Sequence, residues 1–175
     1  MPTEHDAAEQ FIETWGSMGV LWGINRSMAR IHGLLLVSED PLTLDDISSR
    51  LEISRGNTSM CLKELRGWGV IQRVNLTGER KDYFVVEPDV WRMLFRIAIE
   101  RKKREFDPAR EALAKVMEAA GSRSRGKVKK RIAQMDEILD SVDQVAARFL
   151  ANERSSKLLL RFLTGKILSG DSDLE

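Results

Sequence analysis

The sequence has 175 residues, which is enough for one hydrophobic core with an accessory helical element. Its 28 basic and 27 acidic residues nearly cancel, so a polyanionic partner would have to be recognised by a local cluster of positive charge. One cysteine excludes an internal disulfide, and with only two histidines the chain lacks the usual ligands of a Cys/His metal centre. Without an apolar run of membrane-span length or a signal peptide, we expect a soluble, cytoplasmic protein with no cofactor or metal.

Residues 1–40 are expected to contribute two helices that serve dimerisation and, as a second role, sensing. Apolar side chains recur there at steps of three and four, at Ala8, Phe11, Ile12, Trp15, Met18 and Trp22. Gly16, Gly19 and Gly23 weaken a single continuous helix, so we predict that two helices meet near Gly19. The second helix carries Met28, Ile31, Leu34 and Leu35 on its apolar face.

Residues 41–88 predict a winged helix-turn-helix. Thr43 is a plausible N-cap for a first short helix, Glu52 and Ile53 make a turn, and Ser54 can cap a second helix. The inward face of that second helix is predicted to carry Thr58, Leu62 and Leu65. The hydrophobic period then changes from about 3.6 to 2, which indicates a β-hairpin with its tip at Thr77 and Gly78. This order of elements places one helix in the major groove of DNA and a basic loop on the flanking backbone.

The opposite face of the second helix has the chemistry of a DNA reader. Arg can make two hydrogen bonds to guanine and Asn two to adenine, while Ser and Lys can hold phosphates or base edges. Six basic against three acidic residues lie between Ser54 and Asp82, a local excess in a nearly neutral chain. A solvated surface is the alternative for a lone helix, but the adjoining wing favours DNA binding. The predicted contacts are Ser54, Arg55, Asn57, Ser59 and Lys63 on the helix, with Arg80 and Lys81 on the wing.

Residues 89–175 are expected to be helical and to contain a dimerisation segment. A helix opened by Pro88 should close before Pro108, a short helix should follow from about 108 to 119, and the basic segment 121–131 is either a loop or the entry to the next helix. Across residues 128–149, apolar residues recur at alternating steps of four and three, which is the spacing of a coiled-coil seam. This segment either pairs with a second chain or packs against a helix that folds back within the same chain. It comprises Val128, Ile132, Met135, Leu139, Val142, Ala146 and Phe149. A last amphipathic helix is predicted from Leu159, Phe162, Leu163 and Ile167.

Two tryptophans raise the question of an effector. Trp15 and Trp22 lie two helical turns apart, and an aromatic box would suit a quaternary ammonium ligand through cation–π attraction. Ordinary core packing is the alternative for aromatic residues at helical spacing. Neither His5 nor His32 lies near a nucleophile or a carboxylate pair in sequence, and the chain has no phosphate-cradling loop, so we expect no enzyme activity and no catalytic residues.

Three stretches resemble the GbsR branch of the MarR-type transcriptional regulators: FIETWGSMGVLWGINRSMARIHGLLL, ISRGNTSMCLKELRGWGV and GERKDY. The resemblance covers roughly residues 8–115. It implies a homodimeric, cytoplasmic prokaryotic repressor with a mainly α fold, a small β-hairpin wing, and N- and C-terminal dimerisation helices. By the same resemblance, the helix matching Ser54 to Arg66 enters the major groove and the loop matching Thr77 to Lys81 forms the wing. Named members of the branch respond to choline.

Together these features predict a sequence-specific regulator that binds double-stranded DNA at a pseudo-palindromic operator as a homodimer. Release by a small-molecule effector, with a choline-like osmolyte as the example, follows from the resemblance. Two alternatives stay open. One is an architectural protein that binds DNA without regard to sequence, and the other is a winged-helix module that docks a protein partner.

Overall fold

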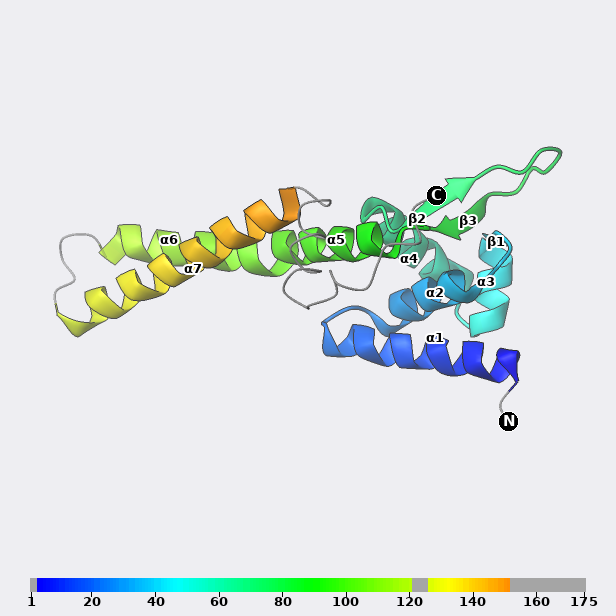
Figure 1. Cartoon of the computed structure of the whole chain (residues 1–175), viewed down its shortest axis with the longest axis horizontal. Helices are drawn as coiled ribbons and strands as arrows, with labels where there is room; N and C mark the ends of the chain where they lie inside the picture. Colours follow the sequence, from blue (N-terminus) through cyan, green and yellow to red (C-terminus); the bar gives the residue numbers. More distant parts are fainter. Residues whose placement is uncertain (1–2, 121–125, 152–175) are drawn as a thin grey trace, which may run out of the picture. The chain divides into compact units, whose positions relative to one another are not determined.

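The structure is a computed structural model that describes residues 3–120 and 126–151 (Figure 1). The chain divides into two compact units, Met1–Met93 and Leu94–Glu175, which are described separately. The mainly helical fold with a small antiparallel sheet is the fold that the sequence predicts. No helix within the described ranges is both long and apolar enough to cross a bilayer.

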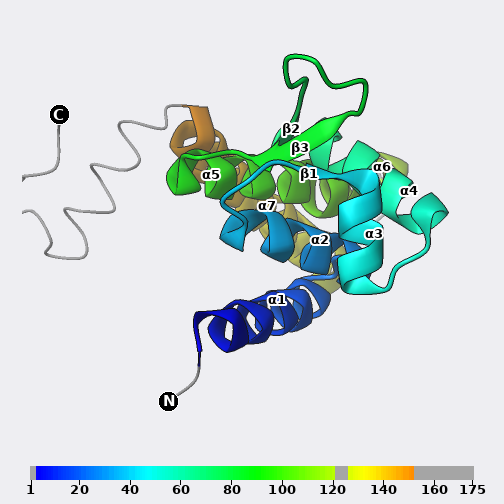
Figure 2. The ribbon, with the colours of Figure 1, turned by 90° about the vertical axis from the view of Figure 1, so that its right-hand side faces the viewer.

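The first unit contains the helix-turn-helix and its wing (Figure 2). A bipartite capping box at Thr43 starts the first helix of the motif, and Ser54 caps the second through the backbone N–H of Asn57, as the sequence predicts. Between them Glu52 takes a left-handed conformation with φ of 54°, which turns the chain sharply. The elements are α1 (Glu4–Leu21), α2 (Arg26–Val37), β1 (Leu42–Thr43), α3 (Leu44–Leu51), α4 (Arg55–Gly67), β2 (Ile71–Val74) and β3 (Tyr83–Val86).

The wing is an antiparallel hairpin of β2 and β3, with Ile71 opposite Val86 and Val74 opposite Tyr83. The loop between these strands projects from the sheet (Figure 2), and Gly78 in it has φ of +87°, which suits the predicted tip. The sequence predicted two strands, whereas the sheet has three, in the order β1-β3-β2. The extra strand is only two residues long and pairs with β3 through Leu42 and Thr43, so it leaves almost no periodic pattern.

The break between α1 and α2 was predicted at the wrong glycine. The chain turns at residues 22–25, where Gly23 has φ of +74°, whereas Gly19 is buried inside α1. A Cβ atom on Gly19 would overlap the Cβ of Ala29 on α2. Gly19 therefore serves close packing of two helices, and its absent side chain is what lets their backbones approach.

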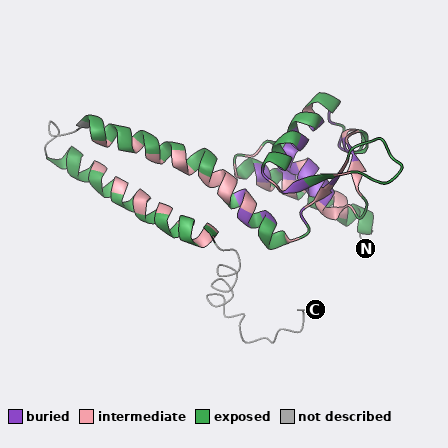
Figure 3. Ribbon diagram, turned by 90° about the horizontal axis from the view of Figure 1, so that it is seen from above, coloured by how far each residue is buried: buried purple, intermediate pink, exposed green. Residues whose placement is uncertain are grey.

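The N-terminal helices and the winged helix share one hydrophobic core, shown in purple in Figure 3. Helix α2 packs against α1, α3, α4 and β3. The sequence-based division at residue 40 therefore separates two segments that fold together. The fully buried side chains of this core include Ile12, Met28, Ile31, Leu34, Ile47, Leu51, Leu62, Leu65 and Val70.

The second unit is a helical hairpin. Helix α5 (Val90–Arg101) ends before Pro108, and α6 (Asp107–Ala120) lies close to the predicted short helix at 108–119. Contrary to the prediction of two separate helices, a π-helical turn, η1 (Lys102–Phe106), joins them without a break. The N–H of Asp107 donates to the carbonyl of Lys102, five residues earlier. This wide turn lets the helical run absorb a proline, whose ring lacks an N–H and would otherwise clash with the preceding turn.

Helix α7 (Lys127–Ala151) runs back alongside α6 in Figure 1, so the predicted heptads pack within one chain along one side. Ile132, Leu139, Ala146 and Phe149 are half-buried, and the Phe149 ring lies 5.5 Å from that of Phe95. The start of α7 shows that the basic residues 127–131 enter a helix. The predicted final helix at Leu159, Phe162, Leu163 and Ile167 lies outside the described residues.

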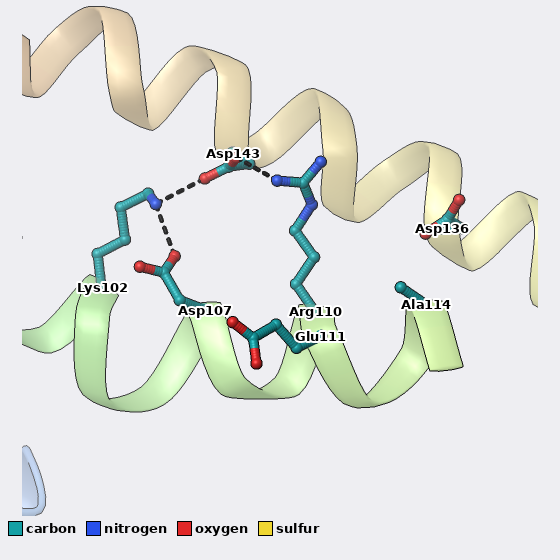
Figure 4. Close-up of a pocket in the computed structure, with 7 residues that line it drawn as sticks. All are labelled: Lys102, Asp107, Arg110, Glu111, Ala114, Asp136 and Asp143. Atoms are coloured by element: carbon teal, nitrogen blue, oxygen red, sulfur yellow. Dashed lines mark hydrogen bonds and ion pairs between the residues drawn. The ribbon is translucent and has the colours of Figure 1, made fainter. Parts of the chain in front are cut away.

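Charged side chains line a cleft between α6 and α7 (Figure 4). Asp143 on α7 accepts a hydrogen bond from Arg110 at 2.6 Å and forms an ion pair with Lys102 at 2.7 Å. Lys102 also pairs with Asp107 at 2.6 Å, and Arg110 with Asp140. These partners raise the pKa of Lys102 and, led by Lys102, lower the pKa of Asp143. The charges of this cleft therefore hold the two arms of the hairpin together.

Candidate DNA-recognition surface

Helix α4 has one buried face and one exposed face, as its predicted period requires. Thr58, Leu62 and Leu65 are buried, and Cys61 joins them at 6% exposure. Burial, followed by the nearby Glu64 carboxylate, raises the pKa of the Cys61 thiol, which keeps the sulfur protonated and unreactive at neutral pH. The exposed residues of α4 are Arg55, Gly56, Ser59, Met60, Lys63, Glu64, Arg66 and Gly67.

Side-chain hydrogen bonds to the backbone fix the turn that aims α4. The Ser48 hydroxyl donates to the Ile53 carbonyl at 2.6 Å, and the Arg30 guanidinium donates to the Leu51 carbonyl at 3.2 Å. At the start of α4, the Ser54 side chain accepts from the N–H of Asn57 at 3.3 Å. Ser54 is therefore a structural cap in the free protein. Any contact of its hydroxyl with a DNA phosphate would come in addition to this capping role.

Asn57 is directed into the protein. Its amide nitrogen donates to the Ser27 hydroxyl of α2 at 3.2 Å, and its carbonyl oxygen accepts from the Cys61 sulfur at 3.5 Å. Both hydrogen-bonding ends of the amide thus have partners within the first unit. The structure brings Arg55, Ser59 and Lys63 together on the exposed face and turns Asn57 away from it, toward α2.

Arg55 has an acidic partner that the sequence analysis did not identify. Its guanidinium forms an ion pair with Asp45 in the first turn of α3, while the two side chains stay 69% and 51% exposed. The neighbouring Asp46 instead completes the capping box, and its hydrogen bonds to Thr43 hold the pKa of that carboxyl below its usual range. Lys81 of the wing lowers the same pKa further, so the base of the wing lies near the start of α3.

The wing presents exposed positive charge. Arg80 and Lys81 are exposed after the hairpin tip, as predicted. Arg73 on β2 pairs with Asp82 at 3.1 Å, which ties the two arms of the hairpin together below the tip. The positions of these cations fit phosphate contacts beside a groove or insertion into a narrow minor groove.

Met60 is a candidate contact to which the sequence analysis gave no role. It lies on the exposed face of α4 and is 72% exposed, which is unusual for a large apolar side chain. An apolar side chain on a reading helix can contact the C5-methyl group of thymine. The sequence did carry a signal for this role, because the 3.6-residue helical period places Met60 on the same exposed face as Ser59 and Lys63.

The predicted effector residues belong to an aromatic cluster at the α1–α2 contact. The Trp15 and Trp22 rings lie 6.2 Å apart and nearly perpendicular, and Phe11 stacks on Trp15 at 5.7 Å. The Trp15 indole N–H donates to Nδ1 of His32 at 3.2 Å. His32 is 3% exposed, and burial lowers its pKa to about 4. Both tryptophans are half-buried, so packing accounts for their positions, and ligand binding there stays a prediction.

Comparison with known proteins gives both sequence and structural relatives, although no family model matches the sequence. YvaV of Bacillus subtilis (strain 168), which is named among the HTH-type transcriptional regulators, is 22% identical over 142 residues, covering 77% of this chain and 80% of YvaV. The HTH-type transcriptional repressor GbsR of the same organism is 29% identical over 85 residues, covering 49% of this chain and 47% of GbsR. The chain thus matches about half the length of GbsR.

A solved crystal structure of a transcriptional regulator shares the fold. It superposes with a TM-score of 0.65 at 21% sequence identity and covers 86% of this chain and 99% of the other. The relatives named here are regulators, and none is named as an enzyme. These matches agree with the architecture.

Proposed function

We propose that this chain, a MarR/GbsR-like winged-helix transcriptional regulator, binds a specific pseudo-palindromic operator as a homodimer. By binding there it would repress the adjoining genes. The observation that carries the proposal is the exposed face of α4, which presents Arg55, Ser59 and Lys63 beside a basic wing. In a two-fold dimer, two such helices would enter successive major grooves about 34 Å apart.

Each exposed side chain is given a role from its chemistry. Arg55 reads guanine, Ser59 and Lys63 contact base edges or phosphates, and Met60 contacts a thymine methyl group. Arg80 and Lys81 contact the backbone or the minor groove beside the site. Asn57, whose amide is occupied by Ser27, positions α4 against α2 rather than reading adenine.

Arg55→Ala and Lys81→Ala are expected to affect DNA binding in different ways. Loss of Arg55 should weaken operator binding by about 1–3 kcal/mol and relax sequence preference at one base pair, because a bidentate base contact is lost. Loss of Lys81 should weaken all sequences alike and reduce the slope of log K against log salt by about one. Fluorescence anisotropy with operator and scrambled duplexes over a salt series measures both effects.

The operator is first obtained by selecting bound fragments from genomic DNA. Lys115→Ala is the matched control, since it removes one positive charge from an exposed position on α6. Equal losses on operator and scrambled DNA for Arg55→Ala would refute its base-reading role. Binding that follows salt but enriches no sequence would favour an architectural protein. Absence of any salt-dependent DNA binding would favour a protein-docking module.

Homodimer formation is supported by an exposed apolar stripe on α7. Met135, Ile138, Val142 and Val145 recur at steps of three and four and are between 47% and 68% exposed. Exposed apolar side chains in one stripe are typical of a protein interface. This stripe is distinct from the half-buried positions that pack within the hairpin, so α7 can serve both contacts.

Ile138→Glu is expected to raise the dimer dissociation constant at least about tenfold, because burying an unpaired carboxylate at an apolar interface is unfavourable. Ala133→Glu, which adds the same charge at an exposed position on the other side of α7, is the control. Analytical ultracentrifugation over a concentration series measures the constant. A dimer that withstands Ile138→Glu would place the interface elsewhere.

Repression and response to an effector are the further parts of the proposal. The repressor named GbsR supports repression by similarity. An effector site beside Trp15 and Trp22, with a quaternary ammonium compound such as choline as the test ligand, follows from the aromatic cluster and is tested by tryptophan fluorescence titration.

A further inference from the structure

The guanidinium of Arg30, on α2, joins α1 to the turn of the helix-turn-helix. Its Nε atom lies 2.7 Å from Oε1 of Glu13 on α1, and its Nη1 atom donates to the Leu51 carbonyl at 3.2 Å. We propose that Arg30 is a positioning residue for DNA recognition, which fixes the direction of α4 relative to α1 and α2. This inference rests on the proposed function, because it assigns what holds the same DNA-binding surface in place.

The Leu51 carbonyl is a point from which α4 can be aimed. Leu51 is the last residue of α3, and three residues, 52–54, separate it from the first residue of α4. The last carbonyls of a helix have no partner within the helix, and positive charge is favoured beside them. The Arg30 guanidinium supplies both a donor and a positive charge at this end of α3. It therefore ties the turn between the two helices to α2.

The path of the Arg30 side chain is set by α1. The side chain is 25% exposed, and its Nε atom is buried. A Cβ atom on Gly16 would lie 2.7 Å from Cγ of Arg30, so the absence of a side chain at Gly16 makes room for the arginine stem. Glu13, three residues earlier and on the same side of α1, holds the guanidinium. The position of α1 thus determines where Arg30 meets the Leu51 carbonyl.

Arg26 provides a comparison within the same helix. It also pairs with Glu13, at 2.8 Å, but its side chain is 60% exposed. Within residues 3–120 and 126–151, no hydrogen bond joins Arg26 to Leu51 or to the turn at 52–54. The two arginines therefore share an acidic partner and differ in their contact with the helix-turn-helix.

The direction of α4 matters more for reading bases than for holding the DNA backbone. Base edges offer hydrogen-bonding groups at fixed positions in the groove, so a tilted helix loses them. Phosphates recur along the whole duplex and are held by charge, so their contacts tolerate a change of tilt better. Without the bond from Arg30, fewer molecules have α4 aligned for the operator, and the apparent operator affinity falls in proportion. Affinity for non-matching DNA should change less.

Arg30→Lys tests this inference in the full-length protein, because lysine keeps the charge but lacks the planar fork that holds two partners at once. We expect operator affinity to fall on the order of fivefold, and affinity for a scrambled duplex to change less than about twofold. Fluorescence anisotropy with the selected operator and the scrambled duplex measures both. Arg26→Lys makes the same exchange at the other partner of Glu13 and is the matched control, which should change neither affinity.

Two further variants separate positioning from other roles. Gly16→Ala displaces the Arg30 stem without altering Arg30, so it should cause the same operator-selective loss, and combining it with Arg30→Lys should add little. Arg30→Gln removes the charge and should leave the salt slope on scrambled DNA unchanged, because Arg30 holds no phosphate. Urea unfolding checks that each variant is folded in the binding assay. A merely structural role would lower the free energy of unfolding and leave the ratio of the two affinities unchanged.

Several outcomes would overturn the inference. These are equal losses on both duplexes for Arg30→Lys, no loss on either, or an equally large operator loss for Arg26→Lys. A salt slope reduced by about one for Arg30→Gln would assign Arg30 to a phosphate instead. In each of these cases the wild-type chain still selects an operator, so the proposed function stands. If the wild-type chain enriches no operator, the proposed function fails and the inference fails with it.

Discussion

Lowering the pH from 7 to 4 is expected to reduce the free energy of unfolding by about 3 kcal/mol through His32 alone. Burial lowers the pKa of this imidazole from 6.5 to about 4, so the unfolded chain takes up the proton at a higher pH than the folded chain. Stability from the neutral ring is present above pH 6.5 and is lost as the pH falls through about 4. The cost arises because the charged ring has almost no access to water.

Urea unfolding of the wild type and of His32→Gln at pH 7, 5.5 and 4 isolates this contribution. Glutamine does not titrate, and its carbonyl can accept the Trp15 indole N–H that His32 accepts now. Protonation of carboxylates with lowered pKa values, such as Glu13 and Asp46, also reduces the free energy of unfolding in acid, but it does so in both proteins. Parallel pH profiles for the two proteins would exclude His32 as the source. Trp15→Phe should retain the pH dependence, because burial is its cause.

Gly19→Val is expected to lower the free energy of unfolding by about 3 kcal/mol, at the upper end of the cost of overpacking a core. A Cβ atom at this position already overlaps the Cβ of Ala29, and neither atom can rotate away because both are fixed to helical backbones. Helices α1 and α2 would have to separate, which would loosen the core that also supports α4. Urea unfolding at pH 7 measures the effect.

Two other glycines provide a graded control. A Cβ on Gly16 would lie 2.7 Å from Cγ of Arg30, a flexible side chain that can move at the expense of its bonds to Glu13 and Leu51. A Cβ on Gly67, at the end of α4, meets nothing within 4 Å. We expect Gly19→Val to destabilise most, Gly16→Val less and Gly67→Val least. Equal effects at Gly19 and Gly67 would contradict close packing of α1 on α2.

Local chemistry made much of the first unit predictable. Thr43 and Ser54 are caps whose partners lie three residues away, and Gly78 occupies a turn that needs positive φ. The period of α4 likewise indicated its buried face. Gly19 was misread because glycine serves both as a helix breaker and as a close-packing residue, and the sequence alone does not distinguish these uses. At Pro108 the π-turn that rescues the helix has no local signature.

The candidate site was predictable only as far as it depends on helix period. Arg55, Ser59 and Lys63 share the exposed face because they recur every four residues. The inward direction of Asn57 depends on Ser27, thirty positions earlier, and the pairing of Arg55 depends on Asp45 in another helix. Such partners are brought together by tertiary packing. The heptad spacing of α7 similarly predicted an apolar face, but it did not identify the helix that packs against that face.

The core shared by α1, α2 and the helix-turn-helix has a consequence for protein engineering. The winged helix-turn-helix cannot be transferred on its own. A graft of residues 41–88 into another scaffold would leave behind Ile31 and Leu34, which are fully buried in the shared core. The transplanted fragment would expose Leu62 and Leu65 to water and lose the bond between Asn57 and Ser27. A chimera that is to retain the recognition helix in its native orientation has to carry α1 and α2 along with it.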